Sequence, residues 1–248
     1  MQTVTGTPAS SPTLCHLLAE DPDLAEAIAP SLRDAAVEAV VVQEIEIGPG
    51  PLPARVRQID GVEAGLGLLV LDGVMLHRVG VRRRFGAELI GEGDVLRPPY
   101  RQGESALTLT NDWLVLQPCR LAVLDEGFVR QLSEFPQIAG RLFRRAVERS
   151  RQLAVNMAIV HQARVDVRLH MLFWHLADRW GRVRSDGVMV PLRLTHAVLS
   201  DLVAARRPTV TSALSDLSRQ GVVNPVPGGW LLSGEPPATA SPRIAAGH

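Results

Sequence analysis

The side chains best able to do chemistry in this chain lie between positions 206 and 215, where arginines and hydroxyls recur among apolar residues at helical spacing. Arg206 and Arg207 open the stretch, and a guanidinium binds phosphate, or the N7 and O6 edge of guanine, in a bidentate manner. The hydroxyls that follow can donate or accept hydrogen bonds. Together these arginines and hydroxyls could recognise a polar, charged polymer.

Two short helices joined by a tight turn are expected to position these groups. Thr195 can cap the first helix, because its hydroxyl accepts an unpaired N–H of the first turn. Pro208 is tolerated only in the first turn of a helix, so the second helix begins near Arg207, and Gly221 ends it. The expected buried faces are Val198, Leu199, Leu202 and Val203 on the first helix, and Val210, Leu214 and Leu217 on the second.

This pattern predicts a helix-turn-helix, which places its second helix in the major groove of DNA. An ordinary amphipathic helix pair in an all-α core would share the apolar spacing, but the Arg-Arg-Pro-Thr opening at 206–209 favours DNA. Two short strands around the turn 227–229 add a wing, and residues 187–192 add another strand. The predicted DNA-binding residues are Thr195, Arg206, Arg207, Thr209, Thr211, Ser212 and Ser215.

Composition narrows the class of protein. The 248 residues are 46% hydrophobic, enough for one large or two ordinary domains, and no apolar run approaches the roughly 18 residues of a membrane span. The N-terminus lacks the features of a signal peptide, and the two cysteines, Cys15 and Cys119, allow no disulfide framework or multi-cysteine metal site. We expect a cytoplasmic protein with no membrane partner. All 26 basic residues are arginine and the net charge is zero, which still permits a local DNA footprint.

Three parts follow one another along the chain. Residues 14–36 carry short helical segments with Pro22 and Pro30 as breaks, and residues 37–124 carry short β-rich runs, typical of a sandwich or roll. From Glu126 the period becomes helical, so the predicted class is α+β. Residues 1–13 and 235–248 are rich in Pro, Ala, Ser and Thr, and we expect them to be disordered.

A long helix is predicted over residues 137–161. Its apolar stripe, interrupted at Arg149, is a candidate dimer interface, and the alternative is a helix packed on its own β-domain. The Arg-rich stretch 141–151 is expected to be a solvated helix face. The predicted dimer-interface residues are Ile138, Leu142, Ala146, Leu153, Met157 and Val160. A further helix with Val165, Leu169, Leu172 and Leu176 should pack beneath the helix-turn-helix.

The order of parts resembles the Crp/Fnr family of bacterial transcription factors. The matching pieces are LLVLDGVMLHRV with its glycine turn, LIGEGDVL, CRLAVLDEGFVRQL before the long helix, and the helix-turn-helix with its wing. The resemblance covers about residues 30–234. It implies a cyclic-nucleotide-binding-type β-roll at 14–135, a dimerisation helix at 136–162 and a winged helix-turn-helix at 163–234.

The departures from the family pattern concern the effector. Family members that bind cyclic AMP carry Gly-Glu after the Gly-Asp turn and then Arg-Ser, whereas Gly93-Asp94 is followed here by residues 95–99 without Glu. Leu109-Thr110-Asn111 stands near the Arg-Ser position, and Leu153-Ala154 replaces the Thr-Ser of the long helix. A phosphate would be poorly neutralised, so we expect no cyclic AMP bound in the family manner. Candidates for another small effector are Arg97, Arg101, Leu153 and Asn156.

The recognition helix departs as well. Of the family's Arg-Glu-x-x-x-Arg, the first Arg matches Arg207, while Pro208 and Ser212 replace the other two residues. Arg207 keeps its role as a candidate reader of guanine, and a different operator is implied. Arg206, Thr209 and Thr211 are assigned to phosphates, which position without specifying sequence.

Alternative functions remain open at this point. A haem sensor would need axial ligands, for which His77, Cys15 and Cys119 are conceivable, and an iron–sulfur cluster would need four cysteines. An enzyme is disfavoured, because no catalytic motif occurs and His170 and His175 lack zinc spacing. A regulator that binds DNA without any ligand is the third alternative.

The sequence therefore predicts a homodimeric transcription regulator on a pseudo-palindromic operator, with no catalytic or metal-binding residues and no resident cofactor. The implied partners are double-stranded DNA, a second copy of the chain and RNA polymerase.

Overall fold

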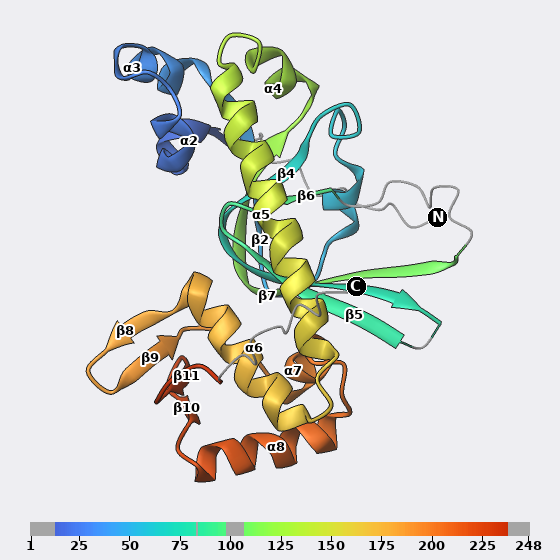
Figure 1. Ribbon diagram of the computed structural model, residues 1–248. Helices are drawn as coiled ribbons and strands as arrows, with labels where there is room; N and C mark the ends of the chain where they lie inside the picture. The colour runs from blue at the N-terminus through green and yellow to red at the C-terminus, as the bar shows by residue number, and fades with distance from the viewer. Residues whose placement is uncertain (1–12, 83, 98–106, 238–248) are drawn as a thin grey trace, which may run out of the picture. The chain divides into compact units, whose positions relative to one another are not determined.

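The computed structural model describes residues 13–82, 84–97 and 107–237. Arg101 and most of the two predicted disordered tails lie outside these ranges. The chain forms two compact units, residues 1–82 with 88–152 and residues 83–87 with 153–248, and the division falls within the long helix α5 (Pro136–Val160). Figure 1 shows the elements in chain order, from the blue N-terminal helices to the orange-red C-terminal ones.

The first unit is built on a seven-stranded sheet in the order β1-β2-β7-β4-β5, with β3 paired to β7 and β6 paired to β4. Its strands are β1 (Thr13–His16), β2 (Val41–Ile47), β3 (Gly50–Pro51), β4 (Gly67–Val81), β5 (Arg84–Gly91), β6 (Val95–Leu96) and β7 (Leu109–Leu124). Its helices are α1 (Leu17–Glu20), α2 (Pro22–Glu26), α3 (Pro30–Ala39), the 3-10 helix η1 (Ala54–Gln58) and α4 (Glu126–Gln131). The predicted mixture of helix and strand is confirmed.

One sequence expectation for this unit is wrong in detail. Asp72-Gly73 does not turn the chain between two strands: it lies at an irregularity in the pairing of the single strand β4 with β7. Gly73 has φ of +97°, and a Cβ there would lie 2.2 Å from the carbonyl oxygen of Pro118, so a side chain is excluded. Pro22 and Pro30 mark the breaks between short helical segments, as predicted, and each begins a new helix, because a proline in the first turn costs no hydrogen bond.

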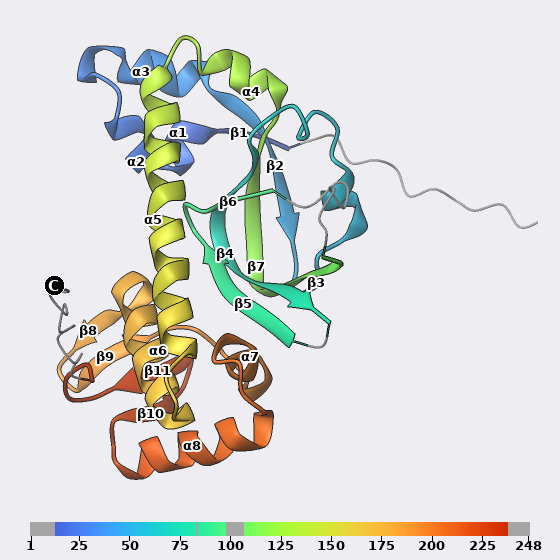
Figure 2. The same ribbon diagram turned by 45° about the vertical axis from the view of Figure 1, so that its right-hand side comes forward.

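Two apolar cores hold the unit together. One lies among the strands and includes Met75, Trp113 and Leu121. The other joins the N-terminal helices to Leu69 and Ala122 of the sheet, and it takes in Ile138 and Leu142 of α5. The first turns of α5 therefore pack on their own sheet, and in both Figure 1 and Figure 2 this part of the helix runs alongside it.

This packing corrects the predicted dimer interface. Ile138 and Leu142 are 0% and 5% exposed in the chain's own core, so a partner subunit has no access to them. The open face of α5 carries Phe143 instead, which is 71% exposed, together with the exposed residues Ala146 and Val147. Leu153 and Met157 are exposed as the sequence interpretation requires, and Val160 is half-buried.

The second unit places α6 (Val165–Trp180), α7 (His196–Leu202) and α8 (Arg207–Arg219) beside a four-stranded antiparallel sheet in the order β10-β11-β9-β8. The strands are β8 (Arg182–Arg184), β9 (Gly187–Val190), β10 (Val223–Val226) and β11 (Gly229–Leu232). Helix α6 contacts α8, as predicted, and buries Leu169, Leu172 and Leu176. Among the described residues of the whole chain, no helix is both long and apolar enough to span a membrane.

Candidate nucleic-acid interface

The turn between α7 and α8 is fixed by local hydrogen bonds. The Thr195 hydroxyl accepts from the backbone N–H of Val198 at 3.2 Å, which confirms the predicted N-cap. Ala204 lies in the left-handed region with φ of +48°, and the N–H of Ala205 donates to the carbonyl of Ser200 at 3.0 Å. Because alanine carries a Cβ, this conformation costs about 1–2 kcal/mol, which the surrounding hydrogen bonds of the turn must offset.

Arg168 supports this turn from α6. Its Nη1 donates to the carbonyl oxygen of Val203 at 3.1 Å, and its Nε donates to the carbonyl of Gln162 at 2.6 Å. A cation at the C-terminal end of α7 satisfies carbonyls that the helix leaves unpaired. The sequence interpretation missed Arg168, because nothing in its spacing reveals a partner 35 residues away.

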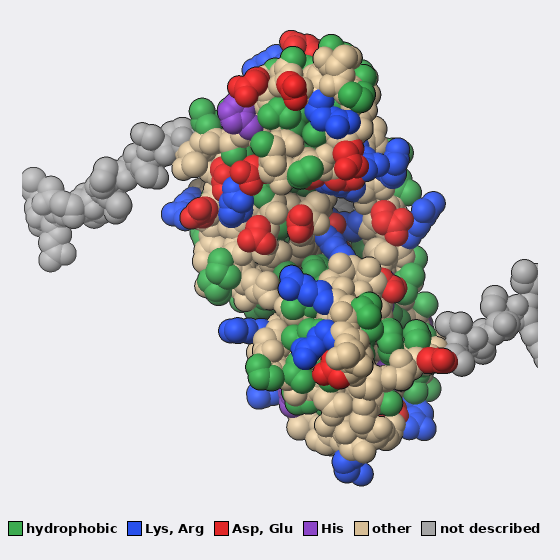
Figure 3. Space-filling model, turned by 90° about the vertical axis from the view of Figure 1, so that its left-hand side faces the viewer, with side chains coloured by type: hydrophobic (Ala, Val, Ile, Leu, Met, Phe, Trp, Pro, Cys, Tyr) green, Lys and Arg blue, Asp and Glu red, His purple; other side chains and the backbone are tan. Residues whose placement is uncertain are grey.

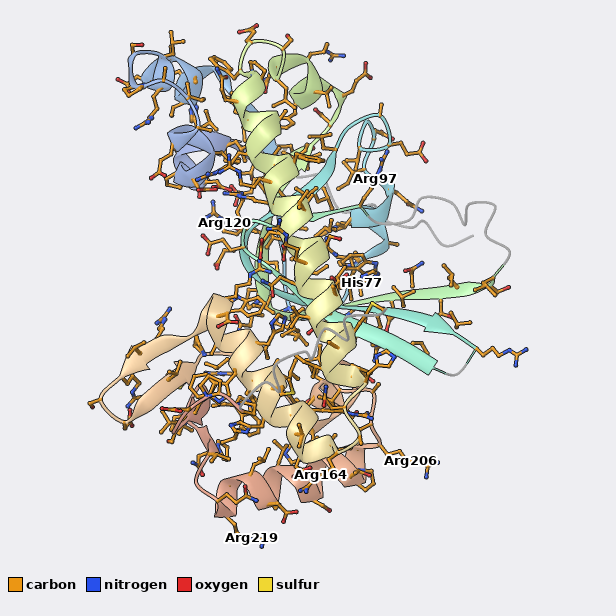
Figure 4. The ribbon with its side chains drawn as sticks, in the orientation of Figure 1. His77, Arg97, Arg120, Arg164, Arg206 and Arg219 are labelled. Atoms are coloured by element: carbon orange, nitrogen blue, oxygen red, sulfur yellow. The ribbon has the colours of Figure 1, made fainter. Side chains whose placement is uncertain are left out.

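Helix α8 separates an apolar from a polar face. Val210, Ala213, Leu214 and Leu217 are buried. All of the predicted DNA-binding residues on and before α8 are exposed: Arg206, Arg207, Thr209, Thr211, Ser212 and Ser215. In Figure 4 the Arg206 side chain points away from the start of α8, and Arg219 lies at the opposite end of the helix. The first turn of α8 holds no acidic residue, so the arginines and the positive end of the helix dipole act together there.

Three exposed hydroxyls of α8 donate to backbone carbonyls of the preceding turn. Thr211 donates to the carbonyl of Arg207 at 3.1 Å, Ser212 to Pro208 at 3.3 Å and Ser215 to Thr211 at 3.0 Å. Serine and threonine commonly make such bonds to the preceding turn of a helix. In this rotamer each hydroxyl offers acceptor lone pairs to an approaching ligand, which suits the exocyclic amines of adenine or cytosine better than a phosphate.

His196 joins the two helices on the same surface. Its Nδ1 lies 2.9 Å from the Thr211 hydroxyl, so the first residue of α7 contacts the second turn of α8. The sequence interpretation did not identify His196. The available signal was its place directly after the N-cap of a helix-turn-helix, where a side chain faces the same side as the recognition helix.

The wing packs on α6 through aromatic rings. Trp230 of β11 and Phe173 of α6 have ring centroids 4.9 Å apart at 43°. Strand β10 pairs with β11 from Val223↔Leu232 to Val226↔Gly229, which leaves Pro227 and Gly228 at the turn and confirms the predicted hairpin. Helix α8 therefore packs against α6 and β10, while its polar face stays exposed.

The roll contains an ionic cluster that joins α5 to β5. Glu88 of β5 receives hydrogen bonds from Arg149 of α5, at 2.7 Å from Nη2 and 3.2 Å from Nε, and its Oε1 lies 2.9 Å from His77 Nδ1. Arg149 Nη1 also donates to the Val95 carbonyl at 2.8 Å. Burial alone would raise the pKa of Glu88, but His77 and Arg149 outweigh it and hold that pKa below the ordinary value.

The candidate effector residues have other roles or lie apart from this cluster. Arg97 donates to the backbone carbonyl of Glu63, Leu153 is exposed and Asn156 is half-buried. Asp94 of the family-like Gly-Asp turn is buried, and its carboxylate accepts from the N–H of Gly91 at 2.9 Å. That turn is therefore a structural element of the roll.

The Arg-rich stretch of α5 is solvated only in part, because Arg144 and Arg151 are exposed while other arginines of the stretch pair with acidic residues. Arg145 binds Asp21 at 2.5 and 2.7 Å and Asp23 at 2.6 Å, and Arg141 also pairs with Asp23. These pairs attach the N-terminal helices to α5. On the face shown in Figure 3, acidic and arginine side chains lie interspersed, in keeping with the net charge of zero.

The residues considered as axial haem ligands, His77, Cys15 and Cys119, are poorly placed for that role. Both ring nitrogens of His77 are engaged, by Glu88 and by Asn111 at 3.3 Å, and the ring stacks on Trp113 at 4.0 Å. Burial raises the pKa of Cys15 and of Cys119 to about 11, so neither thiol is a ready thiolate at neutral pH. Within the described ranges no group of three or more His, Cys, Asp or Glu could hold a metal ion.

Comparisons with known proteins agree with this geometry. The family model for the Crp-like helix-turn-helix domain matches residues 167–232. A CRP-like cAMP-activated global transcriptional regulator of Mycobacterium tuberculosis is 28% identical over 136 residues, which is 54% of this chain and 57% of that regulator. The chain thus matches little more than half the length of this curated relative.

Solved structures share the fold at low identity. A cyclic nucleotide-binding domain containing protein from Listeria monocytogenes has a TM-score of 0.62 at 12% identity, over 77% of this chain and 88% of that one. FixK2 from Bradyrhizobium japonicum has a TM-score of 0.55 at 15% identity, over 78% and 93%. These structures share the fold of the chain. Residues 167–232 form a Crp-like helix-turn-helix domain, and the chain is similar to a CRP-like regulator over about half of its length.

Proposed function

We propose that this protein is a DNA-binding transcription regulator of the Crp/Fnr type, which acts as a homodimer on a pseudo-palindromic operator. The observation that carries the proposal is the exposed polar face of α8, which opens with Arg206 and Arg207 on a helix-turn-helix whose other face is buried. Two such helices would enter successive major grooves about 34 Å apart. The roll at 14–135, the dimerisation helix at 136–162 and the winged helix at 163–234 are the proposed working parts, and DNA in the cytoplasm is the proposed target.

Arg207 is the proposed base reader and Arg206 a phosphate contact. Ser212 and Ser215 stand one and two turns further along the exposed face, with acceptor lone pairs available for base amines. Thr195, Thr209 and Thr211 remain proposed contacts at the edges of this surface. RNA polymerase is a further proposed partner, as the resemblance implies.

The proposed dimer contact is the open face of α5. Ala146, Leu153 and Met157 follow one another at intervals of seven and four along the helix, as a helix–helix seam requires. Phe143 and Val147 widen this face, and both are exposed in the single chain. An apolar strip of this kind is stabilised by pairing with its own copy.

The test is DNA selection from a random-sequence pool, followed by affinity measurement for wild type and Arg207→Ala. We expect a palindromic consensus, and we expect Arg207→Ala to lower affinity for it by about 1–3 kcal/mol while changing affinity for unselected DNA much less. Arg219→Ala, at the far end of α8, is the matched control. Equal losses by Arg207→Ala on selected and unselected DNA would contradict the assigned base-reading role, and no DNA binding at all would contradict the function.

A second candidate, a regulator that needs no ligand, is favoured by one observation. Glu88 already supplies an anion to Arg149, the arginine that α5 points at the roll, so a bound effector would have to displace an internal ion pair. In such a ligand-independent regulator no cofactor or effector is bound, and the function of the roll is to hold α5. Unchanged DNA affinity across a panel of nucleotides and metabolites would support it.

A further inference from the structure

Arg168 binds the backbone at two places that are far apart in the sequence. Its Nη1 donates to the carbonyl of Val203 at 3.1 Å and lies 3.5 Å from the carbonyl oxygen of Ala204. Its Nε donates to the carbonyl of Gln162, just after α5, at 2.6 Å. Within the described ranges no acidic side chain pairs with Arg168. The half-buried guanidinium therefore serves the backbone around the helix-turn-helix and not an ion pair.

The Val203 carbonyl belongs to the peptide that decides the conformation of Ala204. This planar peptide lies between the two Cα atoms, so its rotation changes ψ of Val203 and φ of Ala204 together. The φ of Ala204 is +48°, a left-handed value that is unfavourable for a residue with a Cβ. The amide end of the same peptide, the Ala204 N–H, donates to the Asp201 carbonyl at 3.2 Å. Arg168 thus holds one end of the peptide and α7 holds the other.

The Val203 carbonyl depends on Arg168 for its hydrogen bond. Val203 is 0% exposed, and among the described residues no backbone N–H donates to its carbonyl oxygen. A buried carbonyl without a partner is costly, and a cation suits the C-terminal end of a helix such as α7. Loss of Arg168 would therefore leave this oxygen unpaired, and rotation of the peptide toward another donor would carry Ala204 out of the left-handed region.

We infer that Arg168 is a positioning residue for the DNA-binding surface, because it holds the peptide between Val203 and Ala204 in the left-handed turn and so sets the direction in which α8 leaves α7. The inference rests on the proposed DNA-binding function and adds a residue on which that function depends outside the exposed face of α8. Arg206 and Arg207 come within three residues of Ala204, so a relaxed turn displaces them first.

The size of the effect follows from the strain at Ala204. A left-handed alanine is disfavoured by a factor of about 5 to 30, and this factor limits how far the strained turn is depleted once Arg168 is lost. Affinity falls by the same factor, because a protein that is competent for only part of the time binds correspondingly more weakly. Glycine adopts positive φ about as readily as negative φ, so with Ala204→Gly the loss should be only about twofold.

The test is affinity for the duplex selected from the random-sequence pool. Arg168→Met keeps an apolar stem but no donor, and we expect it to bind about 5- to 30-fold more weakly than wild type. Arg168→Met combined with Ala204→Gly should bind within about twofold of wild type, as should Ala204→Gly alone. Arg179→Met is the matched control, because Arg179 lies at the other end of α6, 4.6 Å from the ring centroid of Trp180, and it should leave affinity unchanged.

Amide hydrogen exchange in the free protein gives a second measurement that needs no DNA, because it reports local opening. The N–H groups of Ala204 and Ala205 donate to carbonyls of α7, and in Arg168→Met they should exchange about 5- to 30-fold faster than in wild type. The N–H of Leu214, within α8, should keep its wild-type rate. Arg168→Lys is the milder variant should Arg168→Met fail to fold, since lysine lacks the rigid fork, and the same changes are expected at smaller size.

The outcomes separate the inference from the function. Weaker DNA binding and a faster-exchanging turn in the Arg168 variant, both reversed by Ala204→Gly in the case of affinity, establish the positioning role. Unchanged affinity, a loss that Ala204→Gly does not reverse, or faster exchange throughout α8 overturns the inference and leaves the proposed function standing. Failure of wild type to bind DNA overturns the proposed function and the DNA-positioning role with it, while the exchange rates still decide whether Arg168 holds the turn.

Discussion

Arg149 interrupts the apolar stripe of α5, and its contacts explain why. The guanidinium reaches Glu88 with two nitrogens and the Val95 carbonyl with the third, so one side chain joins α5 to both β5 and β6. The side chains of Arg149 and Glu88 are both mostly buried, and Glu88 also contacts His77. A half-satisfied cluster of this kind costs free energy, whereas a fully paired one fixes a single arrangement of the elements.

Glu88→Gln is therefore expected to lower the free energy of unfolding by about 2–4 kcal/mol, because it leaves Arg149 charged and poorly paired in a mostly buried site. Urea denaturation measures the change. Glu126→Gln is the matched control, since Glu126 forms an exposed pair with Arg130 at 3.0 Å and its loss should cost no more than about 0.5 kcal/mol. A cost for Glu88→Gln as small as that of Glu126→Gln would show that the cluster does not hold the roll to α5.

The same cluster sets a pH dependence. Although burial opposes it, His77 and Arg149 hold the pKa of Glu88 below its usual value, so the unfolded chain binds a proton at Glu88 more readily than the folded chain. Stability from Glu88 is present above the ordinary carboxyl pKa and is lost as the pH falls through the lower folded value. The difference in unfolding free energy between wild type and Glu88→Gln should shrink steadily as urea titrations move from neutral pH into this acid range. A constant difference would contradict the assignment.

At the scale of elements, local rules predicted the two helices of the helix-turn-helix well. The N-cap at Thr195, the start of α8 at Arg207 and the stop at Gly221 depend on neighbours within a few residues, and the structure confirms all three. The pairing irregularity at Gly73 depends instead on Pro118, which follows 45 residues later on β7. A local pattern of Asp-Gly reads as a turn, and only the pairing partner reveals that the strand continues.

Helix α5 shows the limit of periodicity. A stripe at helical spacing predicts that a face is buried but does not say by what, so Ile138 and Leu142 were assigned to a partner subunit although they pack in their own core. The two roles can be separated by burial in the single chain. Met157 is 63% exposed, whereas Leu142 is 5% exposed.

The corresponding prediction compares two charged substitutions. Met157→Glu should leave the chain folded but monomeric, because it places a charge on the exposed face proposed to meet a second copy. Leu142→Glu should destabilise the roll itself by about 3 kcal/mol or more, because it buries an unpaired carboxylate. Sedimentation velocity gives the oligomeric state and circular dichroism gives the fold. Ala158→Glu is the control for added charge, at an exposed position of the same helix.

A dimer that survives Met157→Glu would remove this face from the interface. A well-folded Leu142→Glu variant that becomes monomeric would restore the original assignment of Leu142 to the interface.

At the scale of the whole molecule, the two functional surfaces differ in how far a sequence can reveal them. The proposed DNA-binding surface is made largely by residues within one helix-turn-helix, so their types and spacing suffice to predict it. The ionic cluster joins residues 61 positions apart in the case of Glu88 and Arg149, and neither residue is unusual in its local context. The departures from the cassette pattern predict that cyclic AMP lacks its usual ligands, and the structure adds the ion pair between Glu88 and Arg149.

This difference leads to a prediction about the intact protein. Cyclic AMP at high concentration should leave the melting temperature unchanged, because Arg149 is already neutralised by Glu88 and Arg97 is held by the Glu63 carbonyl. A ligand present at about a hundredfold its Kd would add about 2.7 kcal/mol, which corresponds to several degrees for a chain of this size. Differential scanning fluorimetry measures this, and a DNA duplex in place of the nucleotide serves as the positive control. Stabilisation by DNA without stabilisation by cyclic AMP is the expected pair of results. A shift with cyclic AMP that is lost in Arg149→Ala would instead mean that the nucleotide displaces Glu88, and the ion pair would then act as a competitor for the effector.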